Sequence, residues 1–193
     1  MSGGSTPPRR PDRRAASALL AVALGLACSG ADAPPPAASR PVLETATVVV
    51  AGEAFEVEVA IDPMDRMRGL SGRTNIPRNG GMLFVLPEPQ PMSMVMRDCP
   101  VPIDVAFIDA MGRVVAIHEM TPEPPREPGE SALRYELRLR EYPSVAPIQF
   151  ALETAGGRLA ELGLQTGDRL HFPARDLIER AKELDRVSES PDN

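Results

Sequence analysis

The sequence predicts a mainly β domain: a compact antiparallel β-sandwich or barrel with short helical turns and a C-terminal amphipathic helix. About seven to nine short segments have strand character, and turn signals separate them roughly every eight to twelve residues. The segments between them are too short for the crossover helices of a long parallel sheet. Trp is absent and aromatic residues make up 4% of the chain, so Val, Ile, Leu and Met must form most of the core.

The first two strands are predicted at Thr47–Val50 and Phe55–Ile61, which residues 51–53 join as a hairpin turn. In the second strand apolar and polar residues alternate, so one face is expected to be buried and the other solvated. Asp62 then suits the cap of a helical turn, because Pro63 follows at the first helical position and Gly69 ends the turn.

The middle of the chain holds the predicted buried strands. Met82–Leu86 is a short apolar run bounded by Gly and Pro, which is typical of a strand covered on both faces. Ile103–Ile108 and Val114–Met120 are joined by Asp109–Gly112, which predicts a second hairpin.

The last third of the domain is predicted from weaker patterns. Tyr135–Leu139 alternates and predicts an edge strand, and Ile148–Leu152 predicts another strand. Arg158–Leu162 predicts one or two helical turns, and Leu170–Phe172 a final short strand. From Ala174 onward apolar residues recur at helical spacing, which predicts an amphipathic helix.

The 193 residues divide into four predicted parts. Residues 1–27 have the layout of a secretory signal, in which four Arg precede a mostly apolar run. That run is shorter than the roughly 20 residues that a membrane-spanning helix needs. Residues 28–44 are rich in Ala and Pro and predict an extended tether. Residues 45–173 form the β domain, and residues 174–193 the C-terminal helix and tail.

The end of the signal resembles the lipobox of bacterial lipoproteins. Gly25-Leu26-Ala27-Cys28 places small residues before a Cys, although lipoproteins usually have Leu where this chain has Gly25. The resemblance implies that cleavage leaves an acylated Cys28, which anchors an exported protein to a membrane of the cell envelope, facing the periplasm or the exterior. The alternative is an ordinary secretory signal that is cut nearby and releases a soluble protein.

The charge of the chain restricts its partners. The net charge is −6, and removing residues 1–27 removes four Arg and one Asp, which leaves −9. Nucleic acid is therefore not expected as a partner, because its phosphates require a basic face. If Cys28 is acylated, Cys99 has no partner for an intramolecular disulfide. Cys99 is then either buried and inert or exposed and reactive.

Most of the candidate site residues lie in the stretch 92–109. A predicted strand at 92–96 meets a polar kink at 97–100 before the next strand begins. This stretch supplies four ligand-binding candidates and Arg68 is the fifth, which gives the set Arg68, Arg97, Asp98, Asp104 and Asp109. They predict a polar pocket that binds a ligand through Arg–carboxylate or Arg–hydroxyl contacts. The alternative is structural, in which Asp104 caps backbone N–H groups or pairs with Arg, because an unpaired buried charge is unfavourable.

The same stretch contains a candidate metal site. Three Met at a spacing of two point the same way from a strand, and Cys99 follows, which gives the set Met92, Met94, Met96 and Cys99. Thioether and thiolate ligands select Cu(I), so an envelope protein that handles copper is one possibility. The alternative is that these Met fill an irregular core, with no cofactor.

Several segments together resemble a known family. They are Arg68-Gly69-Leu70, Gly81–Val85, Met96–Asp109, Tyr142-Pro143-Ser144, Ala151-Leu152-Glu153, Gly156-Gly157 and Gly167-Asp168. In order and approximate spacing they resemble the DUF192 family, a domain of unknown function, over about residues 46–173. The resemblance implies a compact, mostly antiparallel β fold that often follows a signal in envelope proteins, and it implies no activity. Met94-Val95 and Arg97-Asp98-Cys99 depart from the aromatic pair and the Lys-Asn-Thr that are frequent in that family.

No catalytic motif accompanies these residues. The chain lacks a Ser-centred elbow, a His-x-x-x-His pair and a Gly-rich phosphate loop after a strand. The sequence therefore predicts a non-catalytic domain that binds a small ligand or an envelope protein. Cu(I) handling is the first alternative, and the second is a hydrolase that uses a carboxylate pair such as Asp104 with Glu153.

Overall fold

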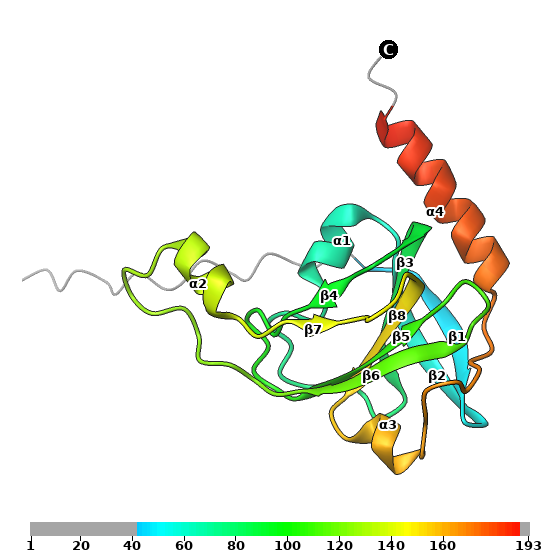
Figure 1. Ribbon diagram of the computed structural model, residues 1–193, viewed down its shortest axis with the longest axis horizontal. Helices are drawn as coiled ribbons and strands as arrows, with labels where there is room; N and C mark the ends of the chain where they lie inside the picture. Colours follow the sequence, from blue (N-terminus) through cyan, green and yellow to red (C-terminus); the bar gives the residue numbers. More distant parts are fainter. Residues whose placement is uncertain (1–41, 190–193) are drawn as a thin grey trace, which may run out of the picture. The chain divides into compact units, whose positions relative to one another are not determined.

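The computed structural model describes residues 42–189, which form a mixed six-stranded sheet, a two-stranded sheet and four helices (Figure 1). The strands are β1 (Thr45–Val50), β2 (Glu53–Ala60), β3 (Gly80–Gln90), β4 (Ser93–Met94), β5 (Ile103–Ile108), β6 (Val114–Met120), β7 (Tyr142–Pro143) and β8 (Ile148–Ala155). The helices are α1 (Pro63–Arg68), α2 (Ala132–Arg138), α3 (Arg158–Glu161) and α4 (Ala174–Glu189). The predicted signal, Cys28 and most of the tether lie outside the described residues.

The mainly β prediction is confirmed, and the sheet corrects its details. The strand order is β1-β2-β3-β8-β5-β6, and every neighbouring pair is antiparallel except β2 and β3. The sheet is not a closed barrel, because the edge strands β1 and β6 do not pair with each other. The segment after α3 forms no strand along either edge, and pairs with them through isolated bridges, Val49 to His171 and Arg113 to Arg169. The short strand predicted at Leu170–Phe172 is therefore wrong.

The central strands of the six-stranded sheet are buried on both faces, while β1 and β2 at one edge keep exposed polar residues on one face. Successive residues of β5 point to opposite faces, and all six are buried, which explains the nearly continuous apolar run. One core packs against α3 and α4 through Leu159, Leu177 and Ala181. The other core lies under the β4–β7 pair and the loop after α1. The predicted sandwich therefore has helices over one face and a small sheet with loops over the other.

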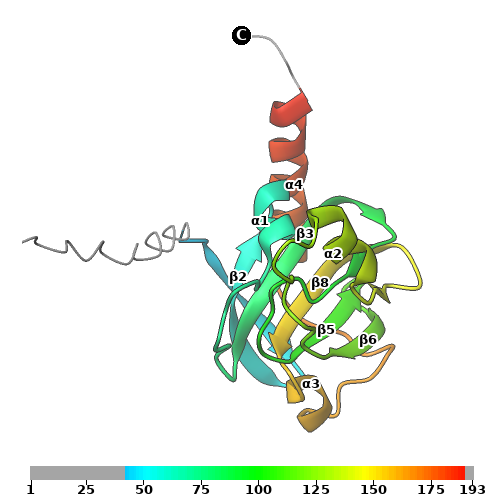
Figure 2. The ribbon, with the colours of Figure 1, turned by 90° about the vertical axis from the view of Figure 1, so that its left-hand side faces the viewer.

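The helix ends follow the sequence signals closely. Asp62 accepts a hydrogen bond from the Met64 N–H at 2.7 Å, Pro63 occupies the first position of α1, and Gly69 ends the helix with a φ of +50°. The predicted C-terminal helix is α4, which buries Leu177 and Ala181. Figure 2 shows α4 extending beyond the sheet at the end of the domain where α1 lies. Within residues 42–189, no helix is both long and apolar enough to cross a membrane.

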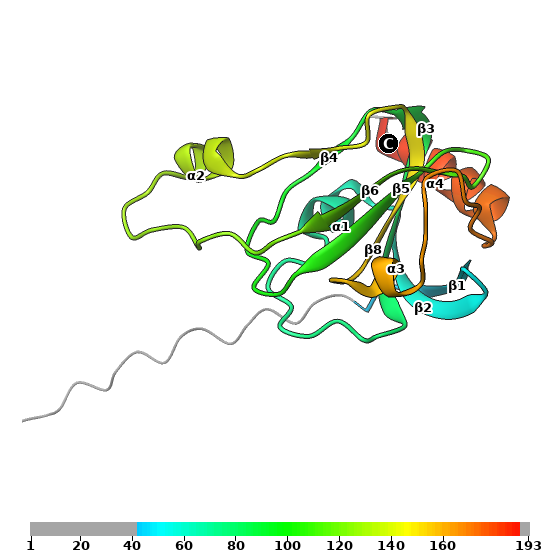
Figure 3. The same ribbon diagram turned by 60° about the horizontal axis from the view of Figure 1, so that its bottom comes forward.

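The edge strand predicted at Tyr135–Leu139 is wrong, because these residues fall in and just after α2. Tyr135 and Leu139 are both buried and Leu137 is exposed, which fits a spacing of four on a helix as well as alternation on a strand. Ser131 distinguishes the helix from a strand, because it is the N-cap of α2 and its hydroxyl accepts a hydrogen bond from the Arg134 N–H at 3.2 Å. The segment that carries α2 extends away from the main sheet (Figures 1 and 3).

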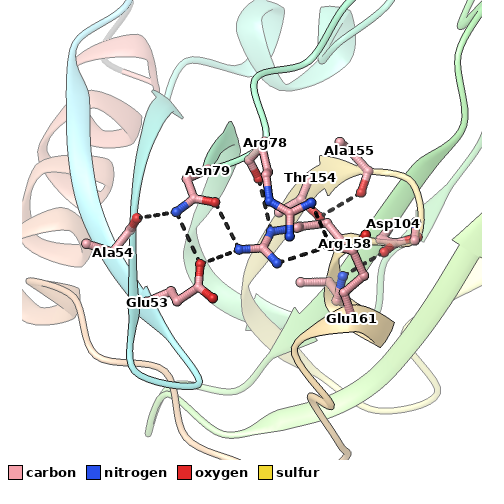
Figure 4. A network of polar contacts seen from close by, with 11 residues as sticks. Glu53, Ala54, Arg78, Asn79, Asp104, Thr154, Ala155, Arg158 and Glu161 are labelled. Atoms are coloured by element: carbon pink, nitrogen blue, oxygen red, sulfur yellow. Dashed lines mark hydrogen bonds and ion pairs between the residues drawn. The ribbon is translucent and has the colours of Figure 1, made fainter.

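A buried arginine stabilises the end of the sheet near α3 (Figure 4). The Arg158 side chain is 4% exposed, forms an ion pair with Glu53 and donates hydrogen bonds to the Asn79 Oδ1 at 3.0 Å and the Arg78 carbonyl at 3.3 Å. Its guanidinium also lies over the Phe55 ring, 5.5 Å from the centroid. A buried charge with this many partners is compatible with a stable fold, so we assign this network a structural role.

Candidate functional site

A cleft of about 320 Å³ opens on the face of the sheet opposite α3 and α4. Pro63 and residues 66–71, from α1 and the loop after it, form one wall, and residues 92–95 line the other side together with Arg97 and Cys99. Phe84 of β3 and Glu153 of β8 come from the sheet and form the floor. The predicted central stretch therefore does border a cleft.

Glu153 is the unusual residue of this floor. Its side chain is 6% exposed, and its Oε2 atom has no hydrogen-bond partner within the described part of the chain. Burial raises the pKa of this carboxyl group to about 7, against the lowering effects of the Leu70 N–H and the Arg73 charge. Close to neutral pH, Glu153 therefore exists in both protonation states.

The space above Glu153 depends on a glycine. A Cβ atom on Gly69 would lie 3.7 Å from the Glu153 Oε2 and 3.3 Å from the Phe84 ring. Gly69 also has the positive φ that ends α1, so one residue closes the helix and leaves room over the carboxylate.

Cys99 lies beside this carboxylate, and its thiol has the features of an unreactive cysteine. It is buried, and its thiol donates a hydrogen bond to the Arg97 carbonyl at 3.3 Å. Burial, together with the nearby charge of Glu153, raises the pKa of the Cys99 thiol to about 11. Of the two alternatives left open by the sequence, the structure shows the buried thiol, and the raised pKa favours its protonated form.

Three arginines line the cleft around this acidic floor. Arg66 donates hydrogen bonds to the backbone carbonyls of Ile61 and Val85. Arg68 forms an ion pair with Asp65 at 2.8 Å. Arg97 forms a two-pronged ion pair with Glu136 of α2, at 2.6 and 2.5 Å. The cleft thus combines positive groups with one buried carboxylate.

The sequence profile of DUF192, described as "Uncharacterized ACR", matches residues 46–172. The chain belongs to the DUF192 family. This match confirms the resemblance predicted over about residues 46–173. No curated protein matches the chain in sequence.

Two crystal structures of bacterial proteins are similar to this DUF192 chain. A proposed transcription regulator from Sinorhizobium meliloti 1021 is 28% identical, with a TM-score of 0.57, and the match covers 70% of this chain and 99% of that one. A protein of unknown function from Novosphingobium aromaticivorans DSM 12444 is 25% identical, with a TM-score of 0.56, and the match covers 69% of this chain and 94% of that one. Both agree with the mainly β fold.

The structure separates the five predicted ligand-binding residues of the DUF192 domain. Arg68 and Arg97 line the cleft. Asp98 lies next to it, has a φ of +52°, and accepts a hydrogen bond from the Tyr135 hydroxyl at 3.2 Å. Asp104 and Asp109 belong to other structural features, so the five do not form one pocket.

Asp104 holds the start of α3. Its two carboxylate oxygens accept hydrogen bonds from the N–H groups of Gly157 and Leu159, each at 2.9 Å, and its side chain is buried. Asp109 caps the β5–β6 turn in a similar way, through the N–H groups of Met111 and Arg113 at 2.8 and 2.9 Å. Both contacts are of the structural kind considered as the alternative for Asp104.

Replacing Asp104 with alanine is expected to lower the free energy of unfolding by about 2–3 kcal/mol, because two buried N–H groups lose a charged acceptor. Urea unfolding of the purified protein measures this change. Asp109→Ala serves as the control, since its turn is exposed to water and a smaller loss of about 1 kcal/mol is expected. Equal effects of the two substitutions would contradict the buried cap.

Asp104 and Glu153 do not form a catalytic carboxylate pair. Asp104 lies opposite Thr154 across the β5–β8 ladder, and Glu153 lies opposite Val105. Neighbouring residues of a strand point to opposite faces of its sheet. The two carboxylates therefore face different cores, and the pair considered for a hydrolase shares no cleft.

The predicted methionine ladder is only partly formed. The strand is shorter than predicted and covers Ser93–Met94; Met92 and Met94 line the cleft with Cys99, while Met96 is 1% exposed in the core. No group of three or more His, Cys, Asp or Glu able to hold a metal ion occurs among residues 42–189. Binding of Cu(I) through sulfur ligands stays a prediction.

Glu153 was missed as the centre of a site by the sequence reasoning, which named it only as a partner for Asp104. The signal was an acidic residue directly after the strand predicted at Ile148–Leu152, and the first seven residues of the observed strand are all buried. A charged residue at such a position is rare unless it has a partner or a function.

Proposed function

We propose that this DUF192 domain is a non-catalytic binding module of the cell envelope that holds a small polar ligand in the cleft over Glu153. The observation that carries the proposal is the Glu153 Oε2 atom, which is buried at the cleft floor without a hydrogen-bond partner among the described residues. Leaving a buried polar atom unpaired costs about 1–3 kcal/mol, and buried polar atoms therefore usually have partners. A bound ligand would supply the missing donor.

The size of the cleft supports a small ligand. Its volume of about 320 Å³ lies at the lower end of the range of ligand pockets, which is about 300–1,000 Å³. The lining is partly apolar, from Leu70, Phe84 and Met94, and partly polar, from the three arginines and Glu153. This combination is typical of a site that selects one compact molecule.

The proposal includes export and anchoring through an acylated Cys28. The basic start, the apolar run and the small residues before Cys28 support it. The net charge of −9 that remains after removal of residues 1–27 makes electrostatic binding to anionic lipid or DNA unfavourable, so the acyl chain would provide the membrane attachment. For the same reason, we do not extend the transcriptional role proposed for the Sinorhizobium protein to this chain.

Native mass spectrometry of the protein extracted gently from its own envelope tests the proposal. We expect a chain that starts at an acylated Cys28 and carries an organic adduct that denaturation releases. Glu153→Met, which removes the polar atoms at similar volume, is expected to lose the adduct, because the ligand loses its partner. Glu119→Met is the matched control, since Glu119 is an exposed glutamate of β6 outside the cleft.

Each part of the proposal can fail separately. A bare wild-type protein, or the same adduct on Glu153→Met, would contradict binding at Glu153. An added mass equal to copper would favour the Cu(I) alternative. A shorter chain without acyl groups would contradict the lipid anchor and leave the binding proposal unaffected.

A further inference from the structure

We infer that the ligand of the Glu153 cleft is a small zwitterion, such as a free apolar α-amino acid, whose ammonium group binds Glu153 and whose carboxylate binds Arg68. This inference rests on the proposed function and names the chemical class of its ligand. Two independent observations carry it: the unpartnered carboxylate oxygen at the floor, and the arginines that line the same cleft.

Glu153, at the floor of the cleft, favours a ligand that carries an N–H donor. The Glu153 Oε2 is an acceptor without a donor in the described chain, and its side chain is 94% buried, so water has little access to it. The other groups near it are the Leu70 N–H, the Arg73 charge and the protonated Cys99. A primary ammonium provides three donors and the opposite charge, which together compensate the burial of a carboxylate.

The arginines that line the cleft favour a negative group at the other end of the ligand. Arg66 and Arg97 are held by backbone carbonyls and by Glu136, respectively. Arg68 is different, because its ion pair is with its neighbour Asp65 on α1 and its side chain is 41% exposed. Such a surface pair is weak and leaves guanidinium donors that can bind a carboxylate in a planar fork.

Ligands of a single charge sign fit the cleft less well. A simple amine would satisfy Glu153 but would also face three guanidinium groups, and a simple carboxylate would face Glu153. A zwitterion satisfies both ends. The apolar residues Leu70, Phe84 and Met94 line the same cleft and suit a short aliphatic side chain.

The first experiment is a titration of the purified full-length protein, freed of its adduct, by isothermal calorimetry. The probes are L-leucine and three relatives of similar shape: N-acetyl-L-leucine, 3-methylbutylamine and 4-methylpentanoate. We expect leucine to bind at least about tenfold more tightly than each relative, because each relative lacks one of the two charges. An equimolar mixture of the twenty common amino acids, analysed by native mass spectrometry, identifies the preferred side chain.

Two variants assign the two ends of the ligand. Glu153→Gln is expected to weaken leucine binding at least about tenfold at pH 8, and Arg68→Met is expected to do the same. Arg68→Met should leave binding of 3-methylbutylamine unchanged or stronger, since that amine has no carboxylate to lose. Arg134→Met is the matched control, because Arg134 is exposed on α2 outside the cleft.

The pH dependence gives an independent readout. A ligand ammonium requires the ionised form of Glu153, whose pKa lies at about 7, so the affinity for leucine should rise about tenfold between pH 6 and pH 8. Melting temperatures measured alongside show that each variant is folded.

The outcomes separate this inference from the proposed function. Tighter binding of 4-methylpentanoate, with an affinity that falls between pH 6 and pH 8, would overturn the zwitterion and keep a ligand at Glu153. Binding of none of the twenty amino acids at millimolar concentration would also overturn the zwitterion, and the adduct of the native protein would then decide the proposed function. Leucine binding that both Glu153→Gln and Arg68→Met leave unchanged would overturn both.

Discussion

Replacing Gly81 with alanine is expected to destabilise the domain by about 4 kcal/mol, a large part of the roughly 5–15 kcal/mol that stabilises a typical domain. Gly81 lies in β3 with a φ of +147°, and a Cβ atom there would be 1.9 Å from the backbone carbonyl oxygen of Glu153 in β8. A backbone atom inside the sheet cannot move aside as a flexible side chain can, so the two strands must separate locally.

The effect of Gly81→Ala also reaches the cleft, because the same contact positions Glu153. Gly52→Ala is the matched control: Gly52 also has a positive φ, of +85°, but no atom lies within 4 Å of the added Cβ. Only backbone strain of about 1–2 kcal/mol is expected there. Urea unfolding compares the two variants. A Gly81→Ala protein no less stable than the Gly52→Ala protein would contradict the close approach of β3 and β8.

Local patterns were sufficient to predict much of this fold. The hairpins around Gly52 and Gly112, the capped helix α1 and the amphipathic α4 all depend on residues close together in sequence, and the structure contains each of them. The α2 segment shows the limit of such patterns. Buried residues at positions 135 and 139 fit both a strand and a helix, and only the cap at Ser131 distinguishes them.

The topology depended on contacts that local patterns do not contain. The parallel pairing of β2 with β3 requires a crossover, and α1 with its following loop provides it. Whether the two sheet edges close into a barrel depends on the segment after α3, which forms an isolated bridge with each edge and no strand.

The site was predicted only in part for the same reason. Arg68 and Arg97 were candidates and do line the cleft. Glu153 acquires its importance from Gly69, Leu70 and Cys99, which are distant in sequence and become neighbours only when the chain is folded. A single Glu in an apolar strand indicates an unusual residue, but its unpaired oxygen is a property of the packing around it.

Replacing Glu153 with glutamine is expected to change how the stability of the ligand-free protein depends on pH. The wild-type carboxyl group has a pKa of about 7 when folded, against an ordinary value of 4.5. The folded protein therefore binds more protons than the unfolded chain between these two values. The free energy of unfolding must then fall as the pH rises from about 4.5 to 7.

As the pH rises from 4 to 8, Glu153→Gln should gain about 3 kcal/mol of stability relative to the wild type, because glutamine does not ionise. A constant contribution from the buried amide cancels in this comparison. Urea unfolding of both proteins at several pH values measures it, with Glu119→Gln as the exposed control. Parallel pH profiles for the wild type and Glu153→Gln would contradict the buried carboxyl group.

A ligand ammonium would oppose this loss of stability, because it stabilises the ionised form of Glu153. Wild-type protein saturated with such a ligand should therefore recover stability at pH 8, and Glu153→Gln should not. The residue that destabilises the empty domain at neutral pH is, on this view, the one that makes ligand binding favourable.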